Sequence, residues 1–205
     1  MQTLIFDFDG TLVDSMALYV AGFNQVAQDF KLPFIQKTDL QMLKQTSAKE
    51  LMLTYKISPF KLAKIFYTVN KNIHQEIANL PFFPGVKPLL LQLAQKYRLG
   101  ILTSNYAENI KAFLNKQSLE VFDYIYCSKN LFGKDQTFLQ LIKKYKLNKA
   151  DILYFGDEVR DIEACRKIGI KVAAVTWGFD DKNLLASKKP DFLFSSPDEI
   201  FRQLA

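Results

Sequence analysis

The sequence predicts an α/β fold, in which a parallel sheet lies between two layers of helices and an all-helical segment is inserted near the N-terminus. Short apolar runs, typical of strands, alternate with amphipathic runs, typical of helices, and this alternation indicates a parallel sheet covered on both faces. Between about Asp14 and Leu80 no run resembles a strand. We therefore expect residues 1–14 and 81–205 to form an α/β core and residues 15–80 to form a helical cap.

The N-terminal elements follow from the spacing of apolar residues. The run Gln2–Asp7 is apolar until it reaches acidic residues, as expected of a buried strand that leads into a loop. Apolar residues then recur at three- and four-residue steps over Met16–Phe30, which predicts an amphipathic helix. The remaining helices of the insert are expected at Leu40–Leu43, Leu51–Tyr55 and Leu62–Ile77.

From Pro81 onwards, predicted strands and helices alternate. Helices are expected at Val86–Tyr97, Ile110–Leu114 and Phe138–Tyr145, and strands at Leu99–Thr103, Tyr124–Cys127, Ile152–Phe155, Ile170–Val175 and Phe192–Phe194. In parallel sheets of this kind the functional site lies at the carboxyl ends of the strands. The residues that follow each strand are therefore the candidates for chemistry.

Composition narrows the classes of function. The 205 residues are 49% hydrophobic, yet no apolar run reaches the roughly 18–20 residues that a membrane span requires. Asp7 and Asp9 interrupt the first apolar run, which is not typical of a signal peptide, so we expect a soluble cytoplasmic protein, as monomer or homodimer. The net charge of +6 comes from scattered lysines without interleaved aromatic residues, so neither nucleic acid nor membrane is an expected partner.

Acidic residues follow two of the predicted strands. Asp7 and Asp9 are two residues apart and face the same space on an extended strand, where they repel each other unless a cation or a shared proton intervenes. Asp157 follows another strand, and Glu158 and Asp161 lie at the start of the next helix. A turn or a helix cap would explain some of these residues singly. It would not explain three carboxylates at one sheet edge, which form the oxygen-rich site that Mg²⁺ takes.

Two further positions are suited to a phosphoryl group. Lys134 begins an amphipathic helix, where it is either a surface lysine or a cation that offsets the charge on Asp7. The hydroxyl and backbone N–H groups of Thr103, Ser104 and Asn105 either cap the following helix or hold phosphoryl oxygens. Their positions alone leave both alternatives open.

Four segments of the chain resemble the motifs of haloacid dehalogenase-like hydrolases, in matching order and spacing. They are Asp7–Ser15 (DFDGTLVDS), Ile101–Asn105 (ILTSN), Gly133–Asp135 (GKD) and Gly156–Asp161 (GDEVRD). The helical insert is similar to the small cap of the phosphoglycolate phosphatase-like subgroup. The resemblance covers almost the whole chain. It implies a core of three layers with a Rossmann-like parallel sheet.

The resemblance also implies an activity, that of a Mg²⁺-dependent phosphohydrolase acting on a small phosphorylated metabolite. Asp7 would attack phosphorus and form an aspartyl-phosphate, while Asp9 would protonate the leaving alkoxide and later activate water. The metal would lie between the Asp7 carboxylate, the Asp9 backbone carbonyl and Asp157. Phosphoryl oxygens would be bound by Thr103, Ser104, Asn105 and Lys134, of which Thr103 and Lys134 also belong to the catalytic set. The supporting residues would be Thr11, Glu158 and Asp161.

Two alternatives remain at this point. A sugar phosphomutase of the same fold would share Asp7 and Asp9 but return the phosphoryl group to its substrate. A non-catalytic binding or regulatory protein would keep the fold, although the intact set of acidic residues disfavours it. Asp9 itself favours phosphate esters, because dehalogenases that resemble this pattern lack the second aspartate. Phosphoglycolate is a candidate substrate only through the resemblance to the subgroup.

Overall fold

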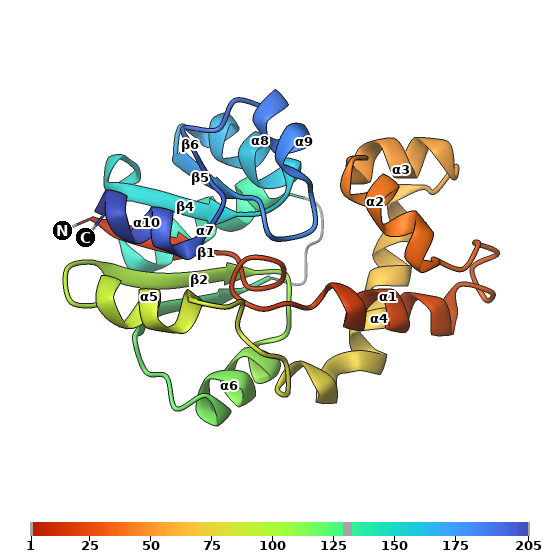
Figure 1. The fold of residues 1–205 in the computed structure, drawn as a ribbon, viewed down its shortest axis with the longest axis horizontal. Coiled ribbons are helices and arrows are strands. Elements are labelled where there is room, and N and C mark those ends of the chain that lie inside the picture. The colour runs from red at the N-terminus through yellow and green to blue at the C-terminus, as the bar shows by residue number, and fades with distance from the viewer. Residues whose placement is uncertain (1, 129–132, 205) are drawn as a thin grey trace.

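A parallel sheet forms the centre of the larger part of the molecule (Figure 1). The computed structural model describes residues 2–128 and 133–204. Within these residues the sheet has six strands in the order β3-β2-β1-β4-β5-β6. They are β1 (Thr3–Phe6), β2 (Arg98–Thr103), β3 (Phe122–Cys127), β4 (Ile152–Gly156), β5 (Lys171–Val175) and β6 (Phe192–Phe194). All neighbours pair in parallel, so the α/β class predicted from the sequence is confirmed.

The four inner strands β1, β2, β4 and β5 are buried on both faces, and alternate residues enter two separate hydrophobic clusters. In β1, Leu4 and Phe6 belong to one cluster and Ile5 to the other, as the alternation of side chains along a strand requires. The first cluster is covered by α5 (Val86–Leu93), α6 (Ala107–Lys116) and α10 (Pro197–Leu204). The second is covered by α7 (Lys134–Tyr145), α8 (Val159–Ile168) and α9 (Lys182–Ser187). A short 3-10 turn, η2 (Lys149–Asp151), precedes β4.

Strand β1 lies where the strand order reverses. Phe6, its last residue, pairs with Ile101 of β2 on one side and with Phe155 of β4 on the other. The chain therefore leaves β1, β2 and β4 at one edge of the sheet, and the connections from β2 and β4 diverge. In open α/β sheets such a switch point forms the crevice that binds ligands.

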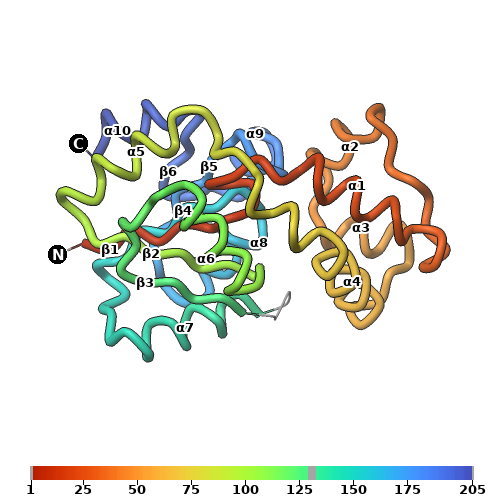
Figure 2. The backbone as a smooth tube through the Cα atoms, turned by 90° about the horizontal axis from the view of Figure 1, so that it is seen from below, coloured from red at the N-terminus to blue at the C-terminus, as the bar shows by residue number. Residues whose placement is uncertain are grey.

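The helices between β1 and α5 stand beside the sheet in both views (Figures 1 and 2), and we call residues 15–80, which contain them, the insert. Its elements are α1 (Met16–Val26), η1 (Lys37–Asp39), α2 (Leu40–Lys44), α3 (Ala48–Thr54) and α4 (Pro59–Ile77). The long α4 begins where Ser58 accepts a hydrogen bond from Lys61 N and Pro59 occupies the first turn. Helix α1 ends at Val26, before the predicted end at Phe30, and the chain then turns at Lys31, whose φ is +52°.

The insert packs internally and joins the core through two neighbouring segments. Helix α1 lies along α4, and a Cβ at Gly22 would come within 2.6 Å of Ile73, so glycine permits this close approach. Val13 and Phe82 form an antiparallel bridge where the chain enters and leaves the insert. No helix of the described residues is long and apolar enough to cross a membrane.

Candidate active site

Lys134 joins two acidic residues at the carboxyl edge of the sheet. Its Nζ lies 2.5 Å from Oδ2 of Asp7, which directly follows β1, and it also forms an ion pair with Asp161 of α8. The Lys134 side chain is only 12% exposed, and its Nζ lies 5.1 Å from the centre of the Tyr154 ring beneath it. Burial favours the neutral amine, but the charges of Asp161 and Asp7 outweigh it and raise the pKa of Lys134 above its ordinary value.

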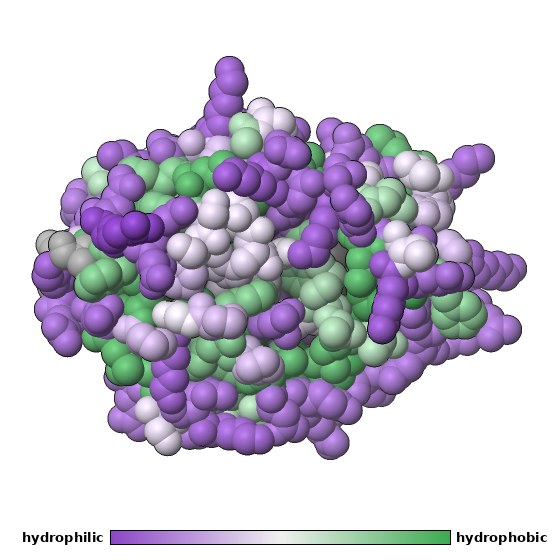
Figure 3. Space-filling model, in the orientation of Figure 1, coloured by the Kyte–Doolittle hydropathy of each residue, from purple (hydrophilic) through white to green (hydrophobic). Residues whose placement is uncertain are grey.

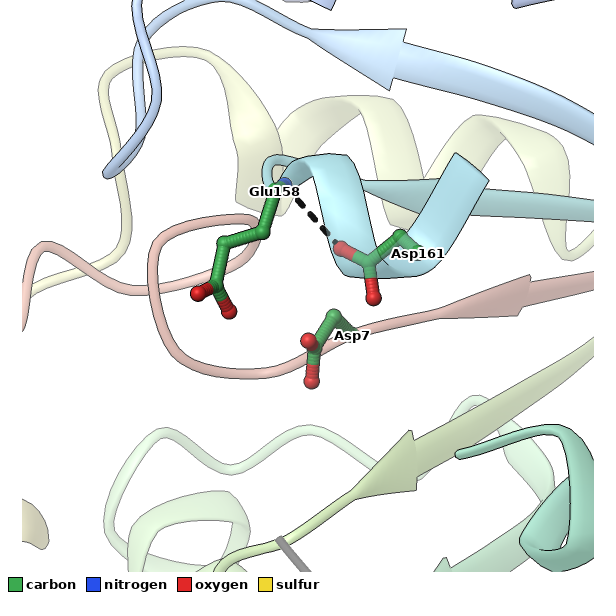
Figure 4. A group of neighbouring side chains, drawn as sticks. All are labelled: Asp7, Glu158 and Asp161. Carbon is green, nitrogen blue, oxygen red and sulfur yellow. Dashed lines mark hydrogen bonds between the residues drawn. The ribbon is translucent and has the colours of Figure 1, made fainter. Parts of the chain in front are cut away.

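Three carboxylates point toward a shared space at this edge (Figure 4). Asp7, Glu158 and Asp161 each offer one oxygen that lies within 4.8 Å of the other two. The Asp161 side chain is held by the backbone N–H of Glu158, at 3.1 Å. A Cβ at Gly156 would come within 2.6 Å of the Asp161 carboxyl carbon, so the close approach of Asp161 requires glycine there. Arg160 Nε donates to Glu158 at 2.7 Å and its Nη2 lies 2.5 Å from the same oxygen.

Asp157 is a completely buried carboxylate that forms no ion pair with a basic side chain among the described residues. Its oxygens accept hydrogen bonds from the Thr11 hydroxyl and the Phe179 backbone N–H, both at 2.8 Å. None of the ion pairs formed by the described residues includes Asp157. Burial, together with the charges of nearby acidic residues, raises its pKa well above the ordinary value. Because each carboxylate oxygen has two lone pairs, each keeps one for a cation.

One oxygen of the Asp9 carboxylate accepts hydrogen bonds from other side chains, and the other does not. Its Oδ2 accepts a hydrogen bond from Asn105 Nδ2 at 3.0 Å and one from the Tyr19 hydroxyl at 3.4 Å. Its Oδ1 is buried and has no hydrogen-bond partner among the described residues. Burial raises the pKa of Asp9 to about 6; the Asn105 hydrogen bond opposes this and the Asp7 charge adds to it.

Three residues that follow or end β2 were predicted to bind phosphate, and the structure gives Thr103 and Ser104 a different environment from Asn105. Thr103 is buried, with its hydroxyl accepting from Asn105 N at 3.0 Å, and Ser104 lines the cleft described below. The side chain of Asn105 is already bonded within the protein. Its Nδ2 donates to Asp9, and its Oδ1 accepts from Asn109 Nδ2 at 2.8 Å and from Tyr106 N at 2.7 Å. The side chain of Asn105 therefore contacts groups of the protein itself, and one of these contacts holds Asp9.

A cleft of about 630 Å³ separates the insert from the core. Apolar and weakly polar side chains gather between the two parts in the space-filling view, with hydrophilic side chains around them (Figure 3). The insert lines the cleft with Tyr19, Ala48, Lys49, Met52, Leu62 and Phe66. The core contributes Asp9, Ser104, Gly133, Lys134, Asp135, Glu158, Arg160, Glu163, Ala164, Lys167 and Phe179. The predicted acid and the predicted cation therefore both face this space.

Several residues at the site were not singled out from the sequence. Arg160 lies inside the GDEVRD segment, so its position between acidic residues could have indicated that it belongs to the site. Tyr19 fits the apolar repeat of a helix, Phe179 ends the Trp177–Phe179 loop that is part of the family resemblance, and Asn70 belongs to no recognisable pattern. Nothing in the local sequence indicates that these three lie near Asp9.

Comparisons with known proteins identify a family and relatives that cover most of the chain. Residues 4–175 match the family model described as haloacid dehalogenase-like hydrolase. A phosphoglycolate phosphatase from Synechococcus elongatus is 38% identical over 204 residues, covering 98% of this chain and 96% of that protein.

Solved structures show the same fold. A predicted phosphatase from Clostridium acetobutylicum superposes with a TM-score of 0.83 at 19% identity, covering 98% of this chain and 97% of the other. A haloacid dehalogenase-like hydrolase from Streptococcus pneumoniae gives a TM-score of 0.80 at 23% identity, with 100% and 99% covered. At these identities the likeness concerns the fold alone.

Proposed function

Because this chain belongs to the haloacid dehalogenase-like hydrolases, we propose that it is a Mg²⁺-dependent phosphohydrolase that acts on a small phosphorylated metabolite. The observation that carries the proposal is the pairing of Asp7 with Lys134 at the switch point of the sheet, beside a cleft that Asp9 lines. A nucleophile, a cation and a proton donor are the groups that transfer of a phosphoryl group to an enzyme requires.

The first step is attack of Asp7 Oδ on phosphorus, which forms an aspartyl-phosphate and breaks the bond to the leaving oxygen. Lys134 offsets the charge that collects on the phosphoryl oxygens, and Ser104 lies in the cleft where its hydroxyl can reach them. Asp9 gives its proton to the departing alkoxide. In the second step Asp9 takes a proton from water, which attacks phosphorus and releases phosphate and free Asp7.

The residues present fit a magnesium ion. Asp7 and Asp157 would supply carboxylate oxygens and Asp9 a backbone carbonyl oxygen, which are ligands that Mg²⁺ prefers. The carboxylates that lie within 4.8 Å of one another are those of Asp7, Glu158 and Asp161. Lys134 pairs with Asp7 and Asp161, and Arg160 pairs with Glu158, but in the part of the chain that the structure describes no basic side chain pairs with Asp157. The complete burial of Asp157 supports a cation there, since a bound positive charge would offset the cost of burying the carboxylate. Mg²⁺ would supply charge neutralisation for the phosphoryl oxygens.

Other residues hold the Asp157 carboxylate and the Lys134 side chain in position. Thr11 and Phe179 fix the Asp157 carboxylate, and Asp161 holds Lys134 in place beside Asp7. We propose that the insert acts as a cap that covers the cleft and excludes bulk water from the aspartyl-phosphate. The name of the Synechococcus relative makes phosphoglycolate the first substrate to test.

The test is release of inorganic phosphate from a panel of phosphorylated metabolites that includes phosphoglycolate and sugar phosphates, with Mg²⁺ and with excess chelator. We expect Mg²⁺-dependent release from at least one small ester, and none by the Asp7→Asn variant. Transfer between positions of a sugar phosphate without release of phosphate would point to a mutase instead. Absence of turnover across the whole panel would contradict the proposed function.

A further inference from the structure

Arg160 uses only one edge of its guanidinium group within the protein. Its Nε donates to Glu158 Oε2 at 2.7 Å, and its Nη2 lies 2.5 Å from the same oxygen. A guanidinium group carries five N–H donors in one plane, so both donors of Nη1 and one donor of Nη2 remain. The hydrogen bonds and ion pairs of the described residues do not use Nη1. The edge formed by Nη1 and Nη2 is one that can bind two oxygens of a single oxyanion.

The Arg160 side chain, which is 32% exposed, lines three cavities between the core and the insert. It lines the main cleft together with Asp9 and Lys134, and a small adjoining cavity together with Ser104 and Lys134. It also lines a third cavity, of about 290 Å³, together with Lys49 of the insert. Because Lys134 belongs to the first two cavities and Lys49 to the first and third, Arg160 lies between these two cations along the cleft.

The other acidic side chains that line these cavities have partners elsewhere. Glu163 lies 3.7 Å from Lys188 Nζ, and Asp180 accepts a hydrogen bond from the backbone N–H of Val159 at 2.6 Å. Asp135 of the main cleft pairs with Lys167 at 2.6 Å. Among the ion pairs of the described residues, Arg160 is joined to Glu158 alone. No carboxylate of this part of the chain therefore occupies its second edge.

The wall of the cleft that belongs to the insert offers little to an anion. It consists of Tyr19, Ala48, Met52, Leu62, Phe66 and one cation, the exposed Lys49. An anionic group in the cleft loses contact with water and needs hydrogen-bond donors in return. The core wall supplies them, since Lys134 is placed for the phosphoryl group and Arg160 lies beyond it. A substrate with two anionic groups fits this order of charges.

We propose that Arg160, held by Glu158, is a specificity-determining residue that binds a second anionic group, carried by the leaving portion of the substrate. The inference rests on the proposed function, since the first anionic group is the phosphoryl group beside Asp7 and Lys134. The substrate class is a small phosphate ester that also bears a carboxylate or a second phosphate. Both oxyanions match the two-pronged edge of arginine. Arg160 contacts the leaving portion and not the phosphorus, so its contribution is to affinity and selectivity.

Titration calorimetry in Mg²⁺ with three phosphonates tests this, because phosphonates are not hydrolysed. The probes are 3-phosphonopropionate, with a carboxylate, 1,2-ethanediphosphonate, with a second phosphonate, and propylphosphonate, with a methyl group at the same place. Wild type should bind at least one doubly anionic probe about thirtyfold more tightly than propylphosphonate, the usual effect of a hydrogen-bonded charge pair. The tighter of the two identifies the second group as a carboxylate or a phosphate.

Variants then assign the preference to Arg160. In Arg160→Met the preference should fall below about threefold, while the affinity for propylphosphonate stays unchanged, because only one charge pair is lost. Arg160→Lys keeps the charge without the two-pronged edge and should retain only part of the preference. Arg166→Met is the matched control and should keep all of it, since Arg166 is an exposed residue of the same helix that bonds the carbonyl groups of Lys188 and Lys189.

The outcomes separate this inference from the proposed function. A wild-type protein that binds none of the probes, or binds all three equally, would overturn the role of Arg160. Equal losses for all three probes in Arg160→Met would also overturn it, since Arg160 would then serve the phosphoryl group or the fold. A preference that depends on Arg160, without hydrolysis of any ester, would support the anion site and overturn the phosphohydrolase. Hydrolysis without a preference would do the reverse.

Discussion

The Nζ of Lys134 lies 2.5 Å from Oδ2 of Asp7 although the two residues are 127 positions apart in the chain. The contact exists because α7 begins at Lys134 beside the edge of the sheet where β1 ends. A buried carboxylate thereby gains the positive charge that an incoming phosphate ester also needs.

Replacing Lys134 by methionine should remove this charge while keeping the length of the side chain. We expect kcat/KM to fall by about a hundredfold or more, the usual effect of losing one group that stabilises charge in the transition state. Steady-state kinetics with the best substrate of the panel measure the effect. Lys143→Met, on the exposed side of the same helix, is the control and should remain within twofold of wild type. A loss of less than threefold in Lys134→Met would remove Lys134 from the catalytic set.

Asp7→Asn should abolish turnover and leave the fold intact, because the amide has nearly the same shape but is a poor nucleophile. Phosphate release and trapping of radiolabelled phospho-enzyme after acid quenching are the two measurements. Wild type should show label at an acyl-phosphate, and the variant none. Turnover of an aryl phosphate by the variant within tenfold of wild type would argue against Asp7 as nucleophile.

Magnesium should raise the melting temperature of the protein, because it binds the folded carboxylates and not the unfolded chain. At a Mg²⁺ concentration a hundred times its Kd, the stabilisation is about 2.7 kcal/mol, or roughly 5–10 °C for a chain of this size. Thermal melts in Mg²⁺ and in chelator measure it without any substrate. Asp157→Asn should lose most of the shift, and Asp198→Asn, at an exposed position in α10, should keep it. An Asp157→Asn protein with the full shift would show that Asp157 is not a ligand.

Thiol reagents should not inactivate the enzyme near neutral pH. Burial raises the pKa of Cys127 to about 11, and Cys165 is completely buried, so neither is a ready thiolate. Labelling of Cys127 by iodoacetamide should be about a hundredfold slower at pH 8 than that of an exposed thiol. Its rate should rise about tenfold per pH unit up to pH 11, because only the thiolate reacts. Mass spectrometry follows the labelling, and rapid modification of Cys127 at pH 7 would contradict its raised pKa.

Much of the fold was predictable because each element has a local cause. The run Ile152–Phe155 is apolar and bounded by polar residues, and the structure has β4 over Ile152–Gly156. The family was also identified correctly from the four short motifs, as the match over residues 4–175 confirms. Motifs of this kind are readable because catalysis restricts which residues can stand at a strand end.

Contacts between the insert and the core were not predictable in the same way. Tyr19 and Asn70 are 51 positions apart, and both are ordinary helix residues in the sequence. The contact between them depends on how α1 packs against α4. Tertiary packing of this kind cannot be read from the local sequence. For Asn105 the sequence showed a group able to bind phosphate, but not the neighbouring Asp9 and Asn109 that occupy its side chain.

The bridge between Val13 and Phe82 has a consequence for the evolution of this architecture. Phe83 N donates to Leu12 O at 3.0 Å and Asp14 N donates to Pro81 O at 3.3 Å, so the outgoing and returning chains run side by side. A segment with adjacent ends can be lengthened, shortened or exchanged without disturbing the order of the strands. The sheet can thus keep one reaction chemistry unchanged while different inserts, joined at the same two positions, select different substrates.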